Sequence, residues 1–175
     1  FSARLGNERL RIASQIKNNE EILVMFSGSA PYPLVLAKHS QAKSILGIEI
    51  NPMAHEFAQF NIKKNKCGKI IKLINGDVRK ILPGIKQKFD RILMPLPKTS
   101  EEFLDIALSK AKIGTIINLY SFLNENEIES YGEKIINEGK KNGYDVEIFN
   151  TVKCGKHAPY TYRLCYDLKV LTIKR

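Results

Sequence analysis

Strand-like and helix-like segments alternate along most of this 175-residue chain, and the alternation stops at its end. The last two strand-like segments, Asp145–Val152 and Tyr162–Ile173, have no helical pattern between them. Alternation predicts an α/β fold with a mostly parallel sheet, because each parallel neighbour needs a crossover that is usually a helix. A short connection implies an antiparallel hairpin instead. We therefore expect a mostly parallel seven-stranded sheet that ends in an antiparallel hairpin.

Five strands are expected ahead of that hairpin. The first, Glu21–Phe26, is a largely apolar run of the kind that is buried on both faces of a sheet. The chain has no internal repeat, low-complexity stretch or linker, so we expect one domain over residues 1–175. The other four expected strands are Ser44–Ile50, Ile70–Ile74, Phe89–Met94 and Thr115–Tyr120.

Helices are expected between the strands. Asn7 can cap a helix from Glu8 to Lys17, and Asn51 can cap one that begins at Pro52. The helix from Pro52 has a predicted buried stripe of Ala54, Phe57, Ala58 and Ile62. The remaining expected helices are Pro33–His39, one from a Thr99–Glu102 capping box to Ala111 that Gly114 stops, and Glu125–Asn142, which Gly143 stops.

The formal net charge is +10, with an isoelectric point near 9.5. This balance favours polyanionic partners, nucleic acid first, although a lysine-rich solvated surface gives the same composition. Cys67, Cys154 and Cys165 form no C-x-x-C pair, so we expect reduced thiols in a cytoplasmic protein and no metal site. No apolar run approaches the roughly 20 residues of a membrane span, so no membrane is expected.

The loop after the first expected strand, Phe26-Ser27-Gly28-Ser29-Ala30-Pro31, contains a single glycine. A dinucleotide-binding loop would read G-x-G-x-x-G, which lets the backbone approach a pyrophosphate. S-adenosylmethionine has no pyrophosphate, so one glycine with small neighbours is enough for its methionine part. The loop is compatible with that cofactor, although Ser-Gly-Ser is also an ordinary turn sequence.

Carboxylates follow at the ends of the next two expected strands. Glu49 lies 21 residues after Gly28, where a carboxylate can accept hydrogen bonds from both ribose hydroxyls. Asp77 follows the third strand, where it can face an adenine ring. The structural alternatives are a carboxylate at a helix N-terminus for Glu49 and a turn for Asp77. Ligands of open α/β sheets bind beyond the carboxyl ends of the strands, so the three features together predict an S-adenosylmethionine site.

Two prolines follow the fourth expected strand, in Met94-Pro95-Leu96-Pro97-Lys98. They fix the backbone and remove two hydrogen-bond donors, which predicts free carbonyls in a rigid loop beside the position of methyl transfer. The structural alternative is a simple strand terminator. A parallel sheet that ends in an antiparallel hairpin is usual for methyltransferases and unusual for dinucleotide dehydrogenases, so a nicotinamide enzyme is the third-ranked reading.

Taken together, these segments resemble the catalytic domain of the archaeal and eukaryotic tRNA (guanine(37)-N1)-methyltransferases and the related archaeal wyosine-pathway transferases. The resemblance covers nearly the whole chain. It implies a Rossmann-like class I S-adenosylmethionine-dependent methyltransferase fold and methyl transfer to N1 of guanine 37 in tRNA. Its landmarks are Phe1-Ser2-Ala3-Arg4-Leu5 with Glu8-Arg9, Met25-Phe26-Ser27-Gly28, Ile48-Glu49-Ile50-Asn51-Pro52, Asp77-Val78-Arg79, Met94-Pro95-Leu96-Pro97-Lys98, and Ala158-Pro159 with Tyr162-Arg163.

The resemblance also implies residue roles. Glu8 matches the proposed general base of the family: guanine N1 carries a proton at neutral pH, and a positioned carboxylate can take it. A first-turn helix acid is the structural alternative for Glu8. Pro95 is expected at the catalytic site, tRNA is the expected partner, and we expect a monomer. The expected cofactor contacts are Arg9, Phe26, Ser27, Gly28, Glu49, Ile50, Asp77, Val78, Pro95 and Pro97.

Three departures from the family pattern bear on these expectations. The family commonly shows Ala-Gly-Val-Gly-Pro where this chain has Ser27-Gly28-Ser29-Ala30-Pro31. Many members have an asparagine, thought to help orient the guanine, where Pro95 stands. The N-terminal region of the family, which recognises tRNA shape and contributes a further arginine, is expected ahead of Phe1 and is not part of this sequence.

Two alternatives stay open. Related archaeal enzymes act on a wyosine intermediate or move the aminocarboxypropyl group of the same cofactor, and no motif reports which cofactor carbon faces the nucleophile. The Pro95-Leu96-Pro97-Lys98 loop looks more like the methylating branch. The second alternative is a cofactor-binding or RNA-binding module without catalysis, which the unusual first loop and the missing asparagine motivate.

Overall fold

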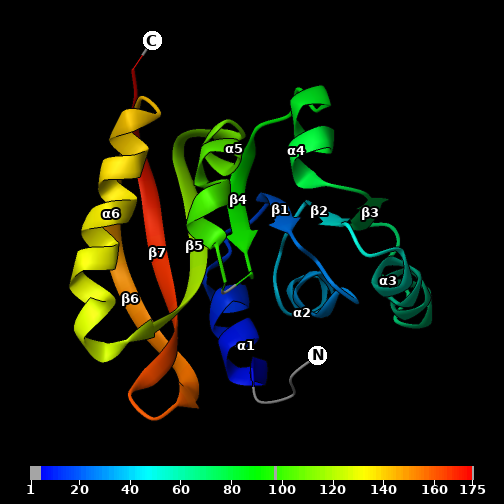
Figure 1. The fold of residues 1–175 in the computed structure, drawn as a ribbon. Helices are drawn as coiled ribbons and strands as arrows, with labels where there is room; N and C mark the ends of the chain where they lie inside the picture. The colour runs from blue at the N-terminus through cyan, green and yellow to red at the C-terminus, as the bar shows by residue number, and fades with distance from the viewer. Residues whose placement is uncertain (1–4, 97, 175) are drawn as a thin grey trace. The chain divides into compact units, whose positions relative to one another are not determined.

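The computed structural model, drawn in Figure 1, describes residues 5–96 and 98–174. These residues divide into two compact units. The first unit ends at Lys86, and the second begins at Gln87. None of the helices in the described ranges is long and apolar enough to cross a membrane.

The first unit contains three parallel strands in the order β3-β2-β1 (Figure 1). All four residues from Ile22 to Met25 are 0% exposed, so β1 is buried on both faces, as its apolar run predicted. Met25 lies opposite Ile48, and Glu49 lies opposite Asn75, so the carboxyl ends of the strands meet at one edge. The strands are β1 (Glu21–Met25), β2 (Ser44–Glu49) and β3 (Ile71–Asn75).

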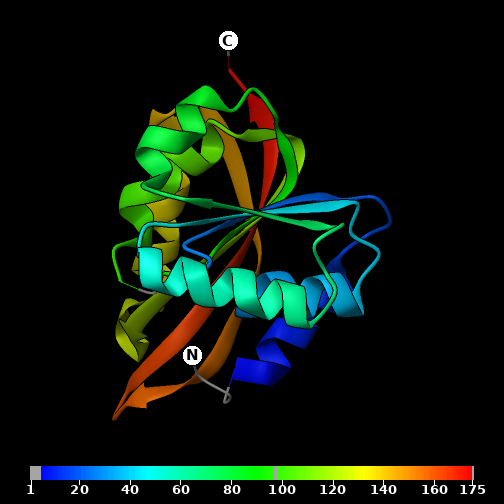
Figure 2. The ribbon, with the colours of Figure 1, turned by 90° about the vertical axis from the view of Figure 1, so that its right-hand side faces the viewer.

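Four helices and a short 3-10 turn accompany these strands; α3, drawn in teal, is seen along its length in Figure 2. α1 packs on α2, where the guanidinium carbon of Arg9 lies 5.7 Å from the ring centre of Tyr32. The elements are α1 (Gly6–Gln15), α2 (Pro31–His39), α3 (Pro52–Lys64), α4 (Val78–Ile81) and η2 (Leu82–Gly84).

One predicted helix cap in this unit is confirmed and one is wrong. The Asn51 side chain accepts hydrogen bonds from the amides of Met53, at 3.0 Å, and Ala54, at 3.4 Å. Asn7 is not a cap, because α1 already begins at Gly6 and its cap residue makes no side-chain bond. The predicted stripe of α3 is narrower than expected: Ala58 and Ile62 are buried, whereas Phe57 is 59% exposed. A helix that packs on a sheet edge covers only part of its apolar face.

The second unit contains four strands in the order β4-β5-β7-β6. β4 (Phe89–Met94) pairs in parallel with β5 (Ala111–Asn124). β7 (Thr161–Ile173) is antiparallel to both β5 and β6 (Tyr144–Ala158), so the predicted closing hairpin is confirmed. β5 and β6 both run further than predicted, because their pairing with β7 continues to the end of the hairpin.

Helical segments of this unit differ from prediction around Thr99. Thr99 has a φ of 59° and forms no side-chain cap, so the predicted capping box is wrong. The helix ends at Leu108 rather than Ala111, and Gly114, with a φ of 89°, lies within β5. There the hydroxyl of Thr115 donates to the Phe89 carbonyl at 2.6 Å, which holds a bulge in the strand. The segments are η3 (Ser100–Phe103), α5 (Leu104–Leu108), η4 (Glu125–Glu127) and α6 (Ile128–Lys141).

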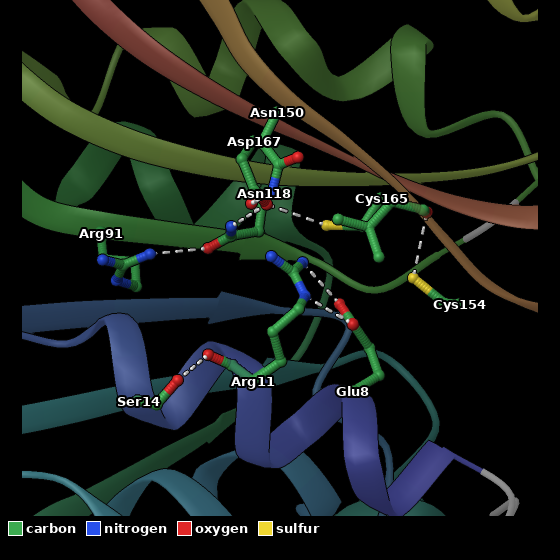
Figure 3. Close-up of polar contacts among 10 residues, drawn as sticks. Glu8, Arg11, Ser14, Arg91, Asn118, Asn150, Cys154, Cys165 and Asp167 are labelled. Carbon is green, nitrogen blue, oxygen red and sulfur yellow. Dashed lines mark hydrogen bonds and ion pairs between the residues drawn. The ribbon is translucent and has the colours of Figure 1, made fainter.

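A network of hydrogen-bonded polar side chains is buried within the second unit (Figure 3). Arg91 donates to the Asn118 side chain at 3.1 Å, and Asn118 donates to Asp167 at 2.7 Å. Asp167 also lies 3.3 Å from the Cys165 sulfur and from the Asn150 amide nitrogen. Buried charges need such partners, so these bonds tie β4, β5, β7 and β6 together.

Candidate functional site

The carboxylate of Glu49 is fixed at the carboxyl edge of the first unit's strands by two backbone amides. The Gly28 amide donates to Oε2 at 2.7 Å, and the Asn51 amide donates to Oε1 at 2.8 Å. The Glu49 carbonyl accepts from the Gly76 amide at 2.9 Å and the Asn75 side chain at 2.7 Å. A carboxylate has about four lone-pair directions, so capacity remains for the two hydroxyls of a ribose.

The loop from Phe26 to Ala30 is held tightly against β2. Its Ser27 amide donates to the Ile48 carbonyl at 2.8 Å, and Phe26, Gly28 and Ala30 all have positive φ, at 58°, 55° and 66°. A left-handed conformation is strained for a bulky residue such as Phe26. Strain of this kind persists only where surrounding bonds over-determine the backbone, so the loop has a preset shape.

Two features of this loop suit a bound ligand. A Cβ built on Gly28 meets nothing within 4 Å, so the backbone there borders open space. The Ser27 hydroxyl is buried and has no hydrogen-bond partner among the described residues. Buried polar atoms are nearly always hydrogen-bonded in native proteins, so this hydroxyl fits a polar group of a bound ligand.

Gly47 makes this loop possible, and sequence reasoning missed it. A Cβ at Gly47 would lie 2.7 Å from Leu73 Cδ2 and 3.1 Å from the Ser27 side chain. The signal was available, since a glycine inside a strand marks a close approach of another segment. Asn61 of α3 was missed as well; its side chain donates to the Ser29 carbonyl at 3.1 Å.

Ile50, Asp77 and Val78 continue the same edge. Ile50 follows Glu49 and is 65% exposed. Asp77 caps α4 by accepting from the Arg79 amide at 2.9 Å, and Val78 behind it is buried. The Asp77 side chain is therefore used for a local hydrogen bond at the start of α4. The exposed side chain of Ile50 leaves an apolar surface for a flat ring.

Glu8 and Arg9 lie on α1, where both are buried, with 6% and 5% of their surface exposed. Arg11 grips the Glu8 carboxylate with two parallel bonds, Nε to Oε2 at 2.7 Å and Nη2 to Oε1 at 2.8 Å (Figure 3). A bidentate ion pair of this kind fixes the plane of the carboxylate. Arg11 was not predicted at the site, although residues three apart on a helix are neighbours and its sequence position pointed to Glu8.

Pro95 follows β4 in the second unit, and Pro97 lies outside the described residues. The expected free carbonyls are only partly free. The buried hydroxyl of Ser100 lies 3.4 Å from the Met94 carbonyl oxygen and is hydrogen-bonded to the Leu96 carbonyl. Ser100 therefore shapes the Pro95 loop, and no pattern in the sequence pointed to it.

The first unit thus brings together Phe26, Ser27, Gly28, Glu49, Ile50, Asp77 and Val78 at one sheet edge. The Glu49 carboxylate can accept hydrogen bonds from a diol, and the exposed Ile50 side chain can contact a flat ring. The space beside Gly28 and the Ser27 hydroxyl, unpaired among the described residues, leave room for a further polar group. A diol and a flat ring are features of a nucleoside, and S-adenosylmethionine fits them. Among the described residues, no group of three or more His, Cys, Asp or Glu side chains could hold a metal ion.

Comparison with known proteins supports the fold described above. A tRNA (guanine(37)-N(1))-methyltransferase, Trm5b of Pyrococcus abyssi, is 35% identical over 97% of the chain, and the chain spans 50% of that protein. Its crystal structure matches 98% of the chain and 50% of the solved chain, with a TM-score of 0.88. The class I methyltransferase fold expected from the sequence is confirmed.

Relatives with another activity are similar to the same degree. A tRNA(Phe) (4-demethylwyosine(37)-C(7)) aminocarboxypropyltransferase of Pyrococcus horikoshii is 34% identical over 97% of the chain, which spans 60% of that protein. The crystal structure of M. jannaschii TYW2 in complex with AdoMet is 29% identical, covers 99% of this chain and 78% of the solved one, and has a TM-score of 0.89.

The family model described as the TRM5/TYW2 methyltransferase domain matches residues 1–147. This match covers most of the chain, including every residue expected at the cofactor and catalytic sites. The chain therefore belongs to the TRM5/TYW2 methyltransferase-domain family.

Proposed function

We propose that this chain transfers the methyl group of S-adenosylmethionine to N1 of guanine 37 in tRNA. The observation that supports this most is the Glu49 carboxylate, which two backbone amides hold at the edge where α/β sheets bind nucleosides. Family membership and the net charge of +10 support tRNA as the substrate. We also propose that the chain acts as a monomer in the cytoplasm.

In this proposal the first unit binds the cofactor. Glu49 accepts hydrogen bonds from the ribose hydroxyls, and Ile50 and Val78 contact the adenine ring near Asp77. The Phe26–Gly28 backbone and the Ser27 hydroxyl bind the methionine part, and Arg9, Pro95 and Pro97 complete the set of contacts. When bound, the cofactor supplies an electrophilic methyl carbon on a positively charged sulfur.

Glu8 is the proposed general base. Guanine N1 becomes nucleophilic as it loses its proton, so a carboxylate must accept that proton while the bond from N1 to the methyl carbon forms. The electron pair of the broken carbon–sulfur bond stays on sulfur. Burial of Glu8 and the two bonds from Arg11 support this role, because both restrict where the carboxylate can point.

The test is methyl transfer by the full-length protein to two tRNA transcripts that differ only at position 37, guanine or adenine. Nuclease digestion and mass spectrometry then identify the product and its position. We expect N1-methylguanosine from the first transcript alone. A Glu8→Gln variant is expected to lose about 10²- to 10⁴-fold in rate with unchanged cofactor affinity. A full rate in that variant would remove Glu8 from the base role, and no transfer to guanine 37 would refute the substrate assignment.

A second candidate is aminocarboxypropyl transfer, or methyl transfer to a wyosine intermediate. The Pyrococcus horikoshii aminocarboxypropyltransferase supports this candidate, because it is 34% identical to the chain, nearly the same as the 35% of the Pyrococcus abyssi methyltransferase. The same digestion separates the reactions, because an aminocarboxypropyl group adds far more mass than a methyl group. A chain that binds the cofactor and modifies none of these substrates would instead be a binding module.

A further inference from the structure

The tip of the β6–β7 hairpin in the second unit, drawn in orange in Figure 2, carries basic residues without acidic neighbours in sequence. From 148 to 166 the chain contains no aspartate or glutamate, but it contains Lys153, Lys156, His157 and Arg163. The Ala158-Pro159 and Tyr162-Arg163 landmarks fall in this segment, and neither has a part in the cofactor site. The proposed cofactor site therefore leaves the basic residues of this tip without a role.

Aromatic rings and a guanidinium group form a layered stack beside the tip. The rings of Phe122 and His157 stack with centres 4.1 Å apart and an angle of 21° between their planes. The guanidinium carbon of Arg163 lies 5.1 Å from the Tyr120 ring centre and 6.0 Å from that of Phe122. The registers place Phe122 opposite Arg163 and Tyr120 opposite Cys165, so these side chains share one face of the hairpin sheet.

This face is the one that α6 leaves uncovered. α6 packs on the other face, where the Tyr131 and Tyr166 ring centres are 5.6 Å apart. Along this face the side chains change from fully buried at Tyr120, through half-buried at Phe122 and Arg163, to exposed at His157 near the tip. The outer side of the His157 ring is therefore available to a further flat group.

Arg163 has hydrogen-bonding capacity to spare. Its Nε is buried and has no hydrogen-bond partner among the described residues. Ring contacts orient a guanidinium without using its N–H donors, so this Nε fits a ligand with an acceptor oxygen, such as a phosphate. Lys153 is opposite Leu164, so it lies on the other face of the hairpin, 4.4 Å from the Tyr162 ring centre and paired with the Glu125 carboxylate at 2.5 Å.

We propose that this hairpin cluster, made of Phe122, His157 and Arg163, binds single-stranded RNA. A base stacks on His157, and a neighbouring phosphate binds Arg163. Aromatic platforms interleaved with basic side chains are the usual means of holding unpaired nucleotides. An acidic peptide would pair with the basic side chains but would place no flat ring on His157, so RNA fits the cluster better. The inference rests on the proposed function for its choice of RNA and adds a binding surface outside the cofactor-binding edge.

The test measures binding of the full-length protein to a 5′-labelled anticodon stem-loop RNA by fluorescence anisotropy over a salt series. We expect His157→Ala and Arg163→Gln each to weaken binding about tenfold. Arg163→Gln should also lower the slope of log affinity against log salt by about 0.7 for the lost phosphate contact. His157→Tyr keeps a stacking ring and should bind as the unaltered protein does. Lys140→Gln, an exposed charge on α6, is the matched control and should change affinity less than twofold.

The outcomes separate this inference from the proposed function. Unchanged RNA affinity in His157→Ala and Arg163→Gln, with normal tRNA methylation by the unaltered protein, overturns the inference alone. Weakened RNA binding in these variants, in a protein that methylates no tRNA, overturns the proposed function alone. Equal competition by polyglutamate and by unlabelled RNA would show a general anion surface and overturn the inference. Calorimetric titration with S-adenosylmethionine checks that each variant is folded.

Discussion

At the scale of single residues, the bidentate pair between Arg11 and Glu8 leads to a prediction. Arg11 holds both carboxylate oxygens of Glu8, at 2.7 and 2.8 Å, so its loss should let that side chain leave its present orientation. A catalytic group that moves by about 1 Å can cost up to a hundredfold in rate. We therefore expect Arg11→Gln to lower kcat about tenfold or more without changing the affinity for S-adenosylmethionine.

Single-turnover methyl transfer and calorimetric titration together check this prediction. Lys17→Gln is a matched control, because it removes the same charge from an exposed position just beyond α1. A positioning role for Arg11 fails if the two variants have the same rate. Partial recovery of the rate in Arg11→Lys would show that charge contributes beside the geometry of the bidentate pair.

The residues of the candidate site differ in how far the sequence could predict them. Gly28, Glu49 and Asp77 were identifiable because each follows a predicted strand, and parallel strands bring their carboxyl ends to one edge. The bond from the Gly28 amide to Glu49 joins residues 21 positions apart, so only folding shows it. Ser100 was not identifiable, because its hydroxyl reaches the Leu96 carbonyl through a backbone path that the Thr99 conformation sets.

At the scale of elements, the contact between η3 and α6 predicts a pH-dependent stability. Tyr131 of α6 donates to the Glu101 carboxylate at 2.7 Å, and Lys134 lies 3.5 Å from the same side chain. Burial alone would raise the pKa of Glu101, but these hydrogen bonds and the lysine charge outweigh it and lower the pKa below 4.5. A lowered carboxyl pKa stabilises the fold above about pH 4.5, and this contribution is lost as the pH falls through the lowered value.

Tyr131→Phe should therefore reduce the free energy of unfolding by about 1 kcal/mol at pH 7 and by less at pH 3. Urea unfolding at the two pH values measures the difference. Tyr166→Phe is the matched control, because its hydroxyl donates at 2.7 Å to the Ile128 carbonyl, which does not titrate in this range. Equal losses of free energy in the two variants at both pH values would contradict a stabilising role for the ionised Glu101 carboxylate.

Element boundaries show what local patterns miss. The β1 prediction agreed with the structure to within one residue, because a continuous apolar run is buried wherever the sheet places it. The β4 prediction agreed in both bounds, although Asp90 and Arg91 interrupt its apolar residues. The Thr99 capping box failed because a left-handed φ of 59° points the chain away from a cap. β5 runs past Tyr120 to Asn124 because β7 pairs with it there, and such pairing depends on residues about 40 positions away.

At the scale of the whole molecule, the two units carry different candidate activities. The cofactor contacts proposed for the first unit leave only Pro95 and Pro97 to the second. The hairpin cluster lies entirely in the second unit. Each activity can therefore be removed by substitutions in one unit, and binding of the cofactor should not depend on the hairpin cluster.

Thermal unfolding tests this independence. A ligand at 100 times its Kd stabilises the folded state by about 2.7 kcal/mol, which corresponds to a Tm increase of roughly 5–10 °C for a chain of this size. We expect S-adenosylmethionine at that level to raise the Tm of the unaltered chain and of Arg163→Gln equally. Glu49→Gln should abolish most of the increase, because an amide cannot accept from both Gly28 and Asn51 and bind the ribose as well. Glu56→Gln, an exposed carboxylate on α3, should keep the full increase, so an equal increase in both glutamate variants would contradict the role proposed for Glu49.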